Sequence, residues 1–350
     1  MSPRKPVMRG GIDLGGTKIQ AVVVDGKWNV VGQSRHPTPT TGKPEGVAKE
    51  MADALREAAA DAGVETGDLA GAGVGSPGDV DESSGSVSQA RNLPGWNGTF
   101  ELGPWLSDAL GTPVSVGNDV GVATAAEAEL GAGRDYDSLI GVFWGTGVGG
   151  GIILNGNPWL GRGAAGEIGH MVVKKGGAHC TCGRRGCVEA YAGRAAMEIE
   201  ARKRHEKGAK TDLFKIMKKR DRDRLTSGIW ARALKAKDPL AEELIDRAID
   251  ALGAGIASAC NLMDFEAVII GGGLGVRFGE PYVKRIRKAM HPHLFSDDNP
   301  PDVKVAALGD FGGGIGAALL ASKREKKRRA RTKPTNASGD GAPASAKAPA

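Results

Sequence analysis

Short apolar runs on either side of a glycine turn open the chain and recur near its middle. Positions 19–24, soon after Gly15 and Gly16, are rich in β-branched residues, which predicts two strands joined by a tight turn. The same order of apolar run, glycines and apolar run returns at residues 139–154. Two such units far apart in one chain predict two similar subdomains, each presenting a glycine tip to a shared cleft.

Apolar positions at helical spacing alternate with further short apolar runs along the rest of the chain. The helical spacing predicts helices over residues 44–62, 119–130, 193–205, 240–261, 280–290 and 313–321. The short runs predict strands over residues 72–75, 113–117 and 267–270. Because strands and helices alternate, the predicted fold class is α/β.

Length and composition limit the class of protein. With 350 residues the chain can bury a large core and is long enough for two domains. It has no run of about 18 apolar residues, the length that a membrane span requires. The basic stretch at residues 1–9 is not followed by the apolar segment of a secretory signal. We therefore expect a cytoplasmic protein with no membrane partner.

The formal net charge of +6 raises the question of nucleic-acid binding, but the charge is unevenly distributed. Residues 323–350 contain nine Lys or Arg and two acidic residues, a net charge of +7, so the other 322 residues carry −1. This segment turns from a basic run into a sequence rich in Pro, Ala and Ser, which predicts a disordered, solvated tail. The alternative is weak electrostatic binding of polyanions by the tail, and no other nucleic-acid contact is expected.

One histidine and three of the four cysteines fall within eighteen residues: His170, Cys180, Cys182 and Cys187. Imidazole and thiolate are the ligands of tetrahedral structural zinc sites, and the glycines between them let a short loop close around one ion. Glu167 and Glu189 flank this set, so a zinc-pinned loop would hold two carboxylates at positions that suit a hydroxyl-rich ligand. The alternatives are an incidental Cys-x-Cys pattern or a redox pair, which one intervening residue would strain.

Glycine turns bring backbone N–H groups close to a phosphate because no Cβ blocks its approach. The two candidate tips are Asp13, Gly15, Gly16, Thr17 and Lys18 in the first unit and Gly145, Thr146 and Gly147 in the second. Asp13 is placed to organise Mg²⁺, and Thr17 to hydrogen-bond a phosphate oxygen. Each tip alone could be an ordinary hairpin turn, whereas one nucleotide clamped between them needs both. The Gly-Lys-Ser/Thr motif of P-loop enzymes is absent.

Asn118 and Asp119 end a predicted strand and begin a predicted helix. Asp is common as a helix N-cap, but a position after a buried strand equally suits a general base directed into the cleft. Two turn-rich loops, Gly75-Ser76-Pro77-Gly78 and the segment around Asn92, either line a ligand site or merely reverse the chain. Their composition alone favours chain reversal.

Together these motifs resemble the ROK family of bacterial sugar kinases and sugar-responsive repressors, over about residues 9–321. The resemblance rests on the first glycine hairpin, the Ser-Pro-Gly loop, the Asn-Asp pair, the second glycine run and Gly-Glu-Ile-Gly-His at residues 166–170. The most specific element is Cys-x-Cys-Gly-x-x-Gly-Cys-x-Glu at residues 180–189. Its continuation through Gly193 is most similar to the bacterial glucokinases.

The resemblance implies an actin-like, ribonuclease H-like ATPase fold, with two similar α/β domains, an interdomain cleft and a zinc-pinned loop. We expect a flexible N-terminus (1–8), a small domain (9–131), a large domain (132–308) with the zinc loop at 167–189, a helix returning to the small domain (309–322) and a disordered basic tail (323–350). We also expect a homodimer or homotetramer.

The resemblance also assigns roles to residues. Asp119 falls where the family has its catalytic base. Sugar contacts are implied for Gly75, Ser76, Pro77, Gly78, Asn92, Asn118, Asp119, Glu167, His170 and Glu189. ATP, with Mg²⁺, is implied to bind the two tips together with Gly272 and Gly273. A structural Zn²⁺ is implied on His170, Cys180, Cys182 and Cys187, with one ring nitrogen of His170 on zinc and the other toward the sugar.

The activity that this resemblance implies is ATP-dependent phosphorylation of a hexose at its 6-hydroxyl, with glucose as the expected substrate. The alternatives are another hexose or N-acetylhexosamine (mannose, fructose, N-acetylglucosamine or N-acetylmannosamine) and polyphosphate as donor. A sugar-sensing repressor of the family carries a helix-turn-helix domain before the first hairpin, and about ten residues before Asp13 are too few for one. A silent sugar-binding protein is disfavoured by the intact Asp119. The chain departs from the family at Gly121, where Asn is usual, which leaves the helix start and the substrate preference open.

Overall fold

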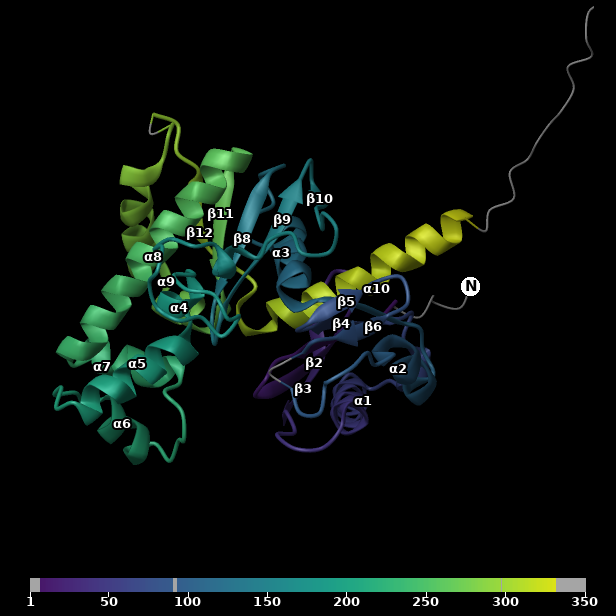
Figure 1. Ribbon diagram of the computed structural model, residues 1–350. Coiled ribbons are helices and arrows are strands. Elements are labelled where there is room, and N and C mark those ends of the chain that lie inside the picture. Colours follow the sequence, from purple (N-terminus) through teal and green to yellow (C-terminus); the bar gives the residue numbers. More distant parts are fainter. Residues whose placement is uncertain (1–6, 91–92, 297, 332–350) are drawn as a thin grey trace, which may run out of the picture.

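The computed structural model describes residues 7–90, 93–296 and 298–331, and it consists of two α/β halves lying side by side (Figure 1). Each half is built on a five-stranded sheet, with strand order β3-β2-β1-β4-β7 in the first and β10-β9-β8-β11-β12 in the second. In both sheets the first three strands are antiparallel and the last two continue parallel to the third. The predicted α/β class with two similar units is confirmed.

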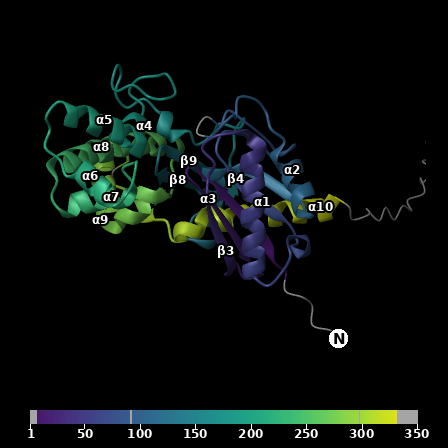
Figure 2. The ribbon, with the colours of Figure 1, turned by 90° about the horizontal axis from the view of Figure 1, so that it is seen from below.

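In the first half, two helices cover the face of the sheet that is turned away from the second half (Figure 2). The strands of this first sheet are β1 (Arg9–Leu14), β2 (Lys18–Val24), β3 (Val30–Pro37), β4 (Ala72–Ser76) and β7 (Val114–Asn118). Helix α1 (Pro44–Asp61) lies along this face, and α2 (Leu102–Leu110) beside it (Figure 2). The core there is apolar and closed, since Met51 and Leu55 of α1 are fully buried against Ile12 and Val74 of the sheet. A 3₁₀ turn (Thr66–Asp68) and a hairpin of β5 (Asp79–Asp81) and β6 (Ser86–Ser88) complete this half.

The second half repeats this arrangement with more helices. Its strands are β8 (Leu139–Trp144), β9 (Val148–Leu154), β10 (Asn157–Pro158), β11 (Ala267–Gly271) and β12 (Asp302–Val305). Its helices are α4 (Glu189–Ala192), α5 (Arg194–Glu206), α6 (Leu213–Lys219), α7 (Ser227–Lys235), α8 (Pro239–Met263) and α9 (Gly272–Met290), with 3₁₀ turns at Ile168–His170, His291–His293 and Gly309–Phe311. Trp144 and Trp230, both fully buried, join the sheet and α7 in one core.

Two helices lie between the sheets. Helix α3 (Asp119–Leu130) packs on β9, and α10 (Gly312–Arg331) packs on β1 and β4, while the two helices also pack on each other. Glycines in the strands make this close packing possible. A Cβ at Gly11 or Gly73 would overlap the backbone of α10, and one at Gly149 would lie 2.7 Å from the side chain of Val120 in α3. These strands therefore need glycine where the helices cross them.

A buried carboxylate holds the crossing together. Glu127 of α3 is 2% exposed, and its oxygens accept hydrogen bonds from the backbone N–H groups of Ala132, Ala307 and Leu308 at 2.8–2.9 Å. Since residues 307–308 lead from β12 toward α10, Glu127 ties the end of α3 to the start of the last helix.

Several elements differ from the sequence expectation. Both glycine hairpins and the helix at residues 119–130 are confirmed. Helix α9 begins at Gly272 rather than at residue 280, and it is interrupted by a break at Gly279, whose φ is +63°. Helix α10 continues through Arg331, so the boundary expected at residue 322 is wrong as a helix end. The N-terminal residues 1–6 and the remainder of the tail from residue 332 lie outside the described residues.

Within the described part of the chain, no helix is both long enough and apolar enough to cross a membrane.

Candidate functional site

Three parallel strands of the first sheet end at a common edge, and the candidate residues follow them. Asp13 of β1 is in register with Gly75 of β4, and Ser76 of β4 with Asn118 of β7. Asp119 begins α3 directly after β7, and a Cβ at Gly75 would lie 3.2 Å from the Cα of Asp119. The sheet therefore brings residues that are about a hundred positions apart in the chain to one place.

Asn118, not Asp119, caps the helix. The Asn118 Oδ1 accepts hydrogen bonds from the N–H groups of Val120 (3.1 Å) and Gly121 (3.0 Å), so the N-cap alternative considered for Asp119 is wrong. Gly121 takes part in this cap through its backbone, so the helix start is intact despite the departure from the family pattern. With its oxygen engaged, Asn118 keeps its amide N–H groups as donors for a ligand.

The Asp119 carboxyl lies in an unusual electrostatic environment. Burial, together with the neighbouring charge of Asp13 and a smaller contribution from Glu167, raises the pKa of Asp119 to about 7. Backbone hydrogen bonds act in the opposite direction, among them one from the Val120 N–H at 2.9 Å. The pKa of Asp13 is also raised, again mainly by burial, while Lys18 acts in the opposite direction. A carboxyl group that ionises near neutral pH is suited to proton transfer.

The first glycine tip joins β1 to β2 and is held from β3. Gly15 donates its N–H to the Lys18 carbonyl (2.9 Å), and the Thr38 hydroxyl donates to the Gly15 carbonyl (2.6 Å). The Thr17 residue at the tip is exposed. The tip is thus fixed through both the N–H and the carbonyl of Gly15, and the Thr17 side chain is available to a ligand.

The second tip joins β8 to β9 and lies beside the turn that starts α9. A Cβ at Gly145 would lie 3.8 Å from the backbone nitrogen of Gly273. Gly272, with a φ of +79°, could not carry a side chain without meeting the backbone of Trp144. The structure therefore brings together the tip and the Gly272–Gly273 turn that the resemblance assigned to one nucleotide.

The predicted zinc ligands form one cluster. The donor atoms of His170, Cys180, Cys182 and Cys187 all lie within 4.8 Å of one another. His170 Nδ1 is 3.8 Å from Cys180 Sγ, and Cys182 Sγ is 3.8 Å from Cys187 Sγ. A tetrahedron with Zn–S bonds of about 2.3 Å has edges of about 3.8 Å, so these spacings fit a zinc ion. All four cysteines of the chain are free.

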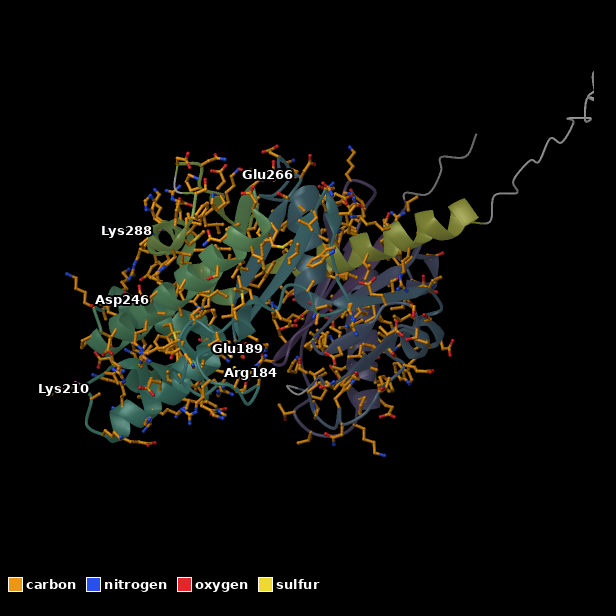
Figure 3. All side chains as sticks on the ribbon, turned by 45° about the horizontal axis from the view of Figure 1, so that its top comes forward. Arg184, Glu189, Lys210, Asp246, Glu266 and Lys288 are labelled. Atoms are coloured by element: carbon orange, nitrogen blue, oxygen red, sulfur yellow. The ribbon has the colours of Figure 1, made fainter. Side chains whose placement is uncertain are left out.

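The cluster orients two carboxylates. His170 Nε2, on the opposite side of the ring from Cys180, lies 3.9 Å from Glu167 Oε2. Glu189 accepts a hydrogen bond from the Val148 N–H (2.9 Å) at the second tip and a longer one from the Thr181 hydroxyl (3.4 Å). In Figure 3, Glu189 lies close to Arg184 of the same loop, on the side of the second half that faces the first. The loop thus connects the cysteine cluster to the glycine tip.

The loop after β4 has a mainly conformational role. Ser76 is fully buried and donates its hydroxyl to the Pro77 carbonyl (3.0 Å). Gly78 has a φ of +92°, and a Cβ there would lie 2.5 Å from the Ser88 carbonyl oxygen. The Ser76 hydroxyl is therefore not presented to a ligand in this structure. Asn92, the other predicted lining residue, lies outside the described residues.

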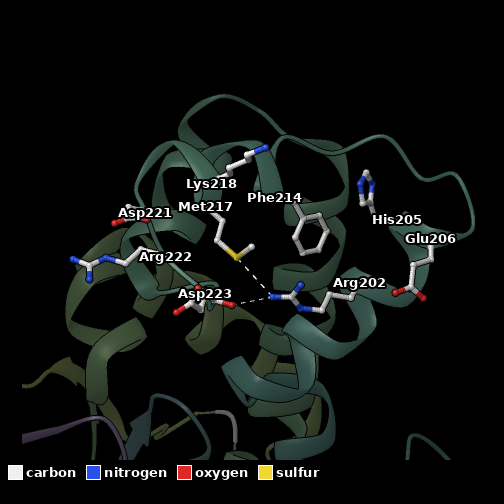
Figure 4. A pocket seen from close by; sticks show the side chains of 9 residues that line it. All are labelled: Arg202, His205, Glu206, Phe214, Met217, Lys218, Asp221, Arg222 and Asp223. Atoms are coloured by element: carbon white, nitrogen blue, oxygen red, sulfur yellow. Dashed lines mark hydrogen bonds between the residues drawn. The ribbon is translucent and has the colours of Figure 1, made fainter. Parts of the chain in front are cut away.

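A separate hollow of about 500 Å³ lies between α5 and α6 (Figure 4). None of the candidate residues lines it. Arg202 at its wall already donates to Glu198 (2.8 Å) and to the Asp223 carbonyl (3.1 Å), and it lies over the Phe214 ring. The guanidinium of Arg202 is therefore already paired within the protein.

Sequence reasoning missed Arg194 at the second tip. Its Nη2 donates to the Thr146 hydroxyl oxygen at 2.7 Å. One signal was present, because Arg194 follows directly on the start of the helix predicted from residue 193, where a positive charge opposes the helix dipole.

Comparison with known proteins agrees with this arrangement. The ROK family profile matches residues 9–324. A glucokinase from Halalkalibacterium halodurans is 32% identical over 324 residues, which cover 90% of this chain and 95% of that protein. The N-acetylgalactosamine kinase AgaK from Shewanella sp. (strain ANA-3) is 32% identical over 324 residues, covering 89% and 95%.

A solved structure extends the likeness to the fold. The ROK family glucokinase from Streptomyces griseus, in complex with glucose and AMPPNP, matches with a TM-score of 0.79 and 32% identity, covering 90% of this chain and 99% of that one. Since the family profile spans nearly the whole chain, from β1 into α10, this protein belongs to the ROK family.

Proposed function

We propose that this protein is an ATP-dependent hexose kinase that transfers the γ-phosphoryl group to the 6-hydroxyl of glucose. The observation that carries the proposal is the Asp119 carboxyl, with a pKa near 7, at the edge where three strands end. The same reaction is supported by the sequence identity of 32% with a glucokinase whose structure holds both glucose and AMPPNP.

Asp119 would act as the general base. Its carboxylate accepts the proton of the sugar 6-hydroxyl as the oxygen attacks the γ-phosphorus, and ADP leaves in line. A base is most effective when its pKa is close to the working pH, and a value near 7 meets that condition. Because the transition state of phosphoryl transfer is loose, the remaining catalysis is positioning and charge stabilisation.

The donor would be held between the two glycine tips. Exposed Thr17 and Thr146 offer hydroxyl groups there, and the Gly272–Gly273 turn beside the second tip suits the nucleotide end. The half-buried carboxylate of Asp13 would hold Mg²⁺, and this ion would neutralise negative charge on the phosphates.

The sugar would be bound by the residues that the cysteine cluster positions. His170 Nδ1 and the three thiolates would hold a zinc ion, which would fix the tautomer of the ring and leave Nε2, 3.9 Å from Glu167, for the sugar. Glu167, Glu189 and the Asn118 amide supply the remaining polar partners. A buried polar partner left unpaired is costly, so this set selects strongly among hydroxyl patterns.

A second substrate class is an N-acetylhexosamine, because AgaK is as similar in sequence to this chain as the glucokinases are. The test is an assay of sugar-phosphate formation over glucose, mannose, fructose and N-acetylhexosamines, run with ATP and repeated with polyphosphate in place of ATP. We expect the highest kcat/KM with glucose and ATP. A preference of more than tenfold for an N-acetylhexosamine would move the assignment to that class, and no turnover of any sugar would refute the kinase.

We also propose a cytoplasmic location, since ATP and a thiolate-bound zinc are both suited to a reducing compartment. The homodimer or homotetramer expected from the sequence stays a prediction.

A further inference from the structure

Arg194 is placed where the donor phosphates are expected, although no motif includes it. It is the first residue of α5, directly after Gly193. The N–H groups of Arg194 and Ala195 donate to the carbonyls of Gly145 (3.1 Å) and Thr146 (3.0 Å). The tip therefore turns its carbonyl groups toward α5. Within the described residues, no hydrogen bond of the Thr146 and Gly147 N–H groups is found, so these donors remain for a ligand.

The Arg194 side chain has a fixed position. Its Nη1 donates to the Leu225 carbonyl at 3.0 Å, while its Nη2 donates to the Thr146 hydroxyl oxygen at 2.7 Å. Leu225 is in turn held by its own N–H, which donates to the buried carboxylate of Glu198 at 3.0 Å. Glu198 also binds Arg224 at 3.1 Å. A chain of hydrogen bonds thus runs from Glu198 through Leu225 and Arg194 to the tip.

The direction of the hydrogen bond to Thr146 has a chemical consequence. A guanidinium group can only donate, so it occupies a lone pair of the Thr146 oxygen. The hydroxyl hydrogen is then left to donate elsewhere, and the side chain of Thr146 is exposed. A threonine whose oxygen is held by a cation is a stronger donor to an anion than a free one.

We propose that Arg194 is a positioning residue for the phosphoryl donor, which orients the Thr146 hydroxyl as a hydrogen-bond donor to a donor phosphate. The inference rests on the proposed function, in that the second tip binds the phosphates of ATP. It goes beyond the family motifs by adding a residue that acts through Thr146.

The surroundings of Arg194 support this role. Its pKa is lowered, mainly by burial and further by Arg224, while Glu198 acts in the opposite direction. A cation at the first position of a helix is also unfavourably placed relative to the helix dipole. Both effects become less unfavourable when an anion binds at the tip.

The test is calorimetric titration of the full-length, zinc-containing protein with MgADP and, separately, with glucose. The variants are Arg194→Met, which removes the charge and both donors, and Thr146→Val, which removes only the hydroxyl. Arg194→Lys and Thr146→Ser are the conservative variants. Arg56→Met is the matched control, because Arg56 also donates to a distant backbone carbonyl, that of Ala109 (2.6 Å), but in the first half.

We expect Arg194→Met and Thr146→Val each to weaken MgADP binding about 10-fold, the loss of one hydrogen bond to a charged group. Glucose binding should change less than about twofold, and KM for ATP should rise while KM for glucose does not. Because Arg194 acts through Thr146, the double variant should bind MgADP little worse than Thr146→Val alone. Thr146→Ser and Arg56→Met should resemble the wild type, and Arg194→Lys should retain part of the affinity.

Two results would overturn the inference. One is a Thr146→Val variant whose affinity for MgADP is within twofold of the wild type. This variant leaves the contact of Arg194 with Leu225 in place, so it remains informative if Arg194→Met does not fold. The other is a double variant whose loss equals the product of the two single losses, which indicates independent roles. If the protein phosphorylates no sugar, the proposed function fails while these titrations still decide the role of Arg194. If the protein is a sugar kinase but the variants bind MgADP as the wild type does, the proposed function holds and only the role of Arg194 is refuted.

Discussion

Replacing Asp119 by Asn should destroy activity and at the same time stabilise the free protein at alkaline pH. An amide keeps the shape of the side chain and can accept the hydrogen bond from the Val120 N–H, but it cannot take a proton. Loss of a general base typically lowers kcat by about 10²–10⁴-fold. Since the proposed sugar partners Glu167, His170 and Glu189 are untouched, glucose should still bind.

The stability gain follows from the raised pKa. The pKa of Asp119 is about 7 in the folded protein, against about 3.9 in an unfolded chain. Below about pH 4 the group is protonated in both states and costs nothing. As the pH rises from about 4 to about 7, the unfolded state ionises first, and the penalty on the folded state grows by about 1.4 kcal/mol per pH unit.

At pH 8 the full penalty is about 4 kcal/mol, and at pH 5 it is about 1.5 kcal/mol. For a protein of 350 residues, with an unfolding entropy of about 2.1 cal/mol/K per residue, these values correspond to increases in Tm of about 6 °C and about 2 °C. Asp119→Asn should therefore melt higher than the wild type, and the difference should shrink as the pH falls.

The assay is thermal unfolding of both proteins without nucleotide or sugar at pH 5, 6.5 and 8, combined with kcat and with glucose titration. Asp108→Asn, on the exposed surface of α2, is the control for loss of one negative charge and should change neither Tm nor kcat. A variant that melts at the wild-type temperature or lower at pH 8 would refute the buried, charge-repelled carboxylate. A variant with near-normal kcat would refute the general base.

Three further predictions concern pH, zinc and the tail. At saturating MgATP, kcat/KM for glucose should rise with pH and then level off, with an apparent pKa no higher than about 7, because Asp119 must lose its proton and Mg²⁺ favours its ionised form. A flat profile from pH 5 to 8 would contradict this. Elemental analysis should give one zinc per chain, and Cys182→Ser should lower the zinc content, the Tm and the affinity for glucose. The control Cys260→Ser, in α8 and outside the cluster, should keep its zinc. Wild-type protein that is purified without chelator and lacks zinc would contradict the site. Truncation after Ser322 removes the exposed Lys323–Glu129 ion pair (2.8 Å), which is worth less than about 1 kcal/mol. Tm should therefore fall by no more than about 2 °C, and ATP-dependent kcat/KM should not change. A larger loss of Tm or of activity would mean that the tail is part of the folded enzyme.

Local patterns were enough to predict the elements that carry the chemistry. The two glycine hairpins and α3 are specified by neighbouring residues, and the zinc ligands lie within one short loop. Other elements lack a local signal. Helices α6 and α7 have seven and nine residues, too few for a clear apolar period, and glycines at the start of α9 conceal its first turns.

The contacts between distant segments could not be predicted, because they exist only after folding. The proximity of Asp13 to Asp119, which raises the pKa of the proposed base, depends on the pairing of β1, β4 and β7. The bond from Val148 to Glu189 and the one from Arg194 to Thr146 likewise join segments about 40 to 50 positions apart. Sequence motifs thus identified the reactive groups, whereas the fold determines how those groups modify one another.

The most direct test of the kinase is to identify the product. The zinc-containing protein is incubated with glucose and MgATP, and the phosphorus species are followed by ³¹P NMR, with Asp119→Asn in parallel. We predict that ATP is converted to ADP with stoichiometric formation of glucose 6-phosphate in the wild type, and that the variant forms none although it binds glucose. ATP consumption that is independent of glucose, or a phosphate ester at another hydroxyl, would contradict the assignment of Asp119 as the base for the 6-hydroxyl.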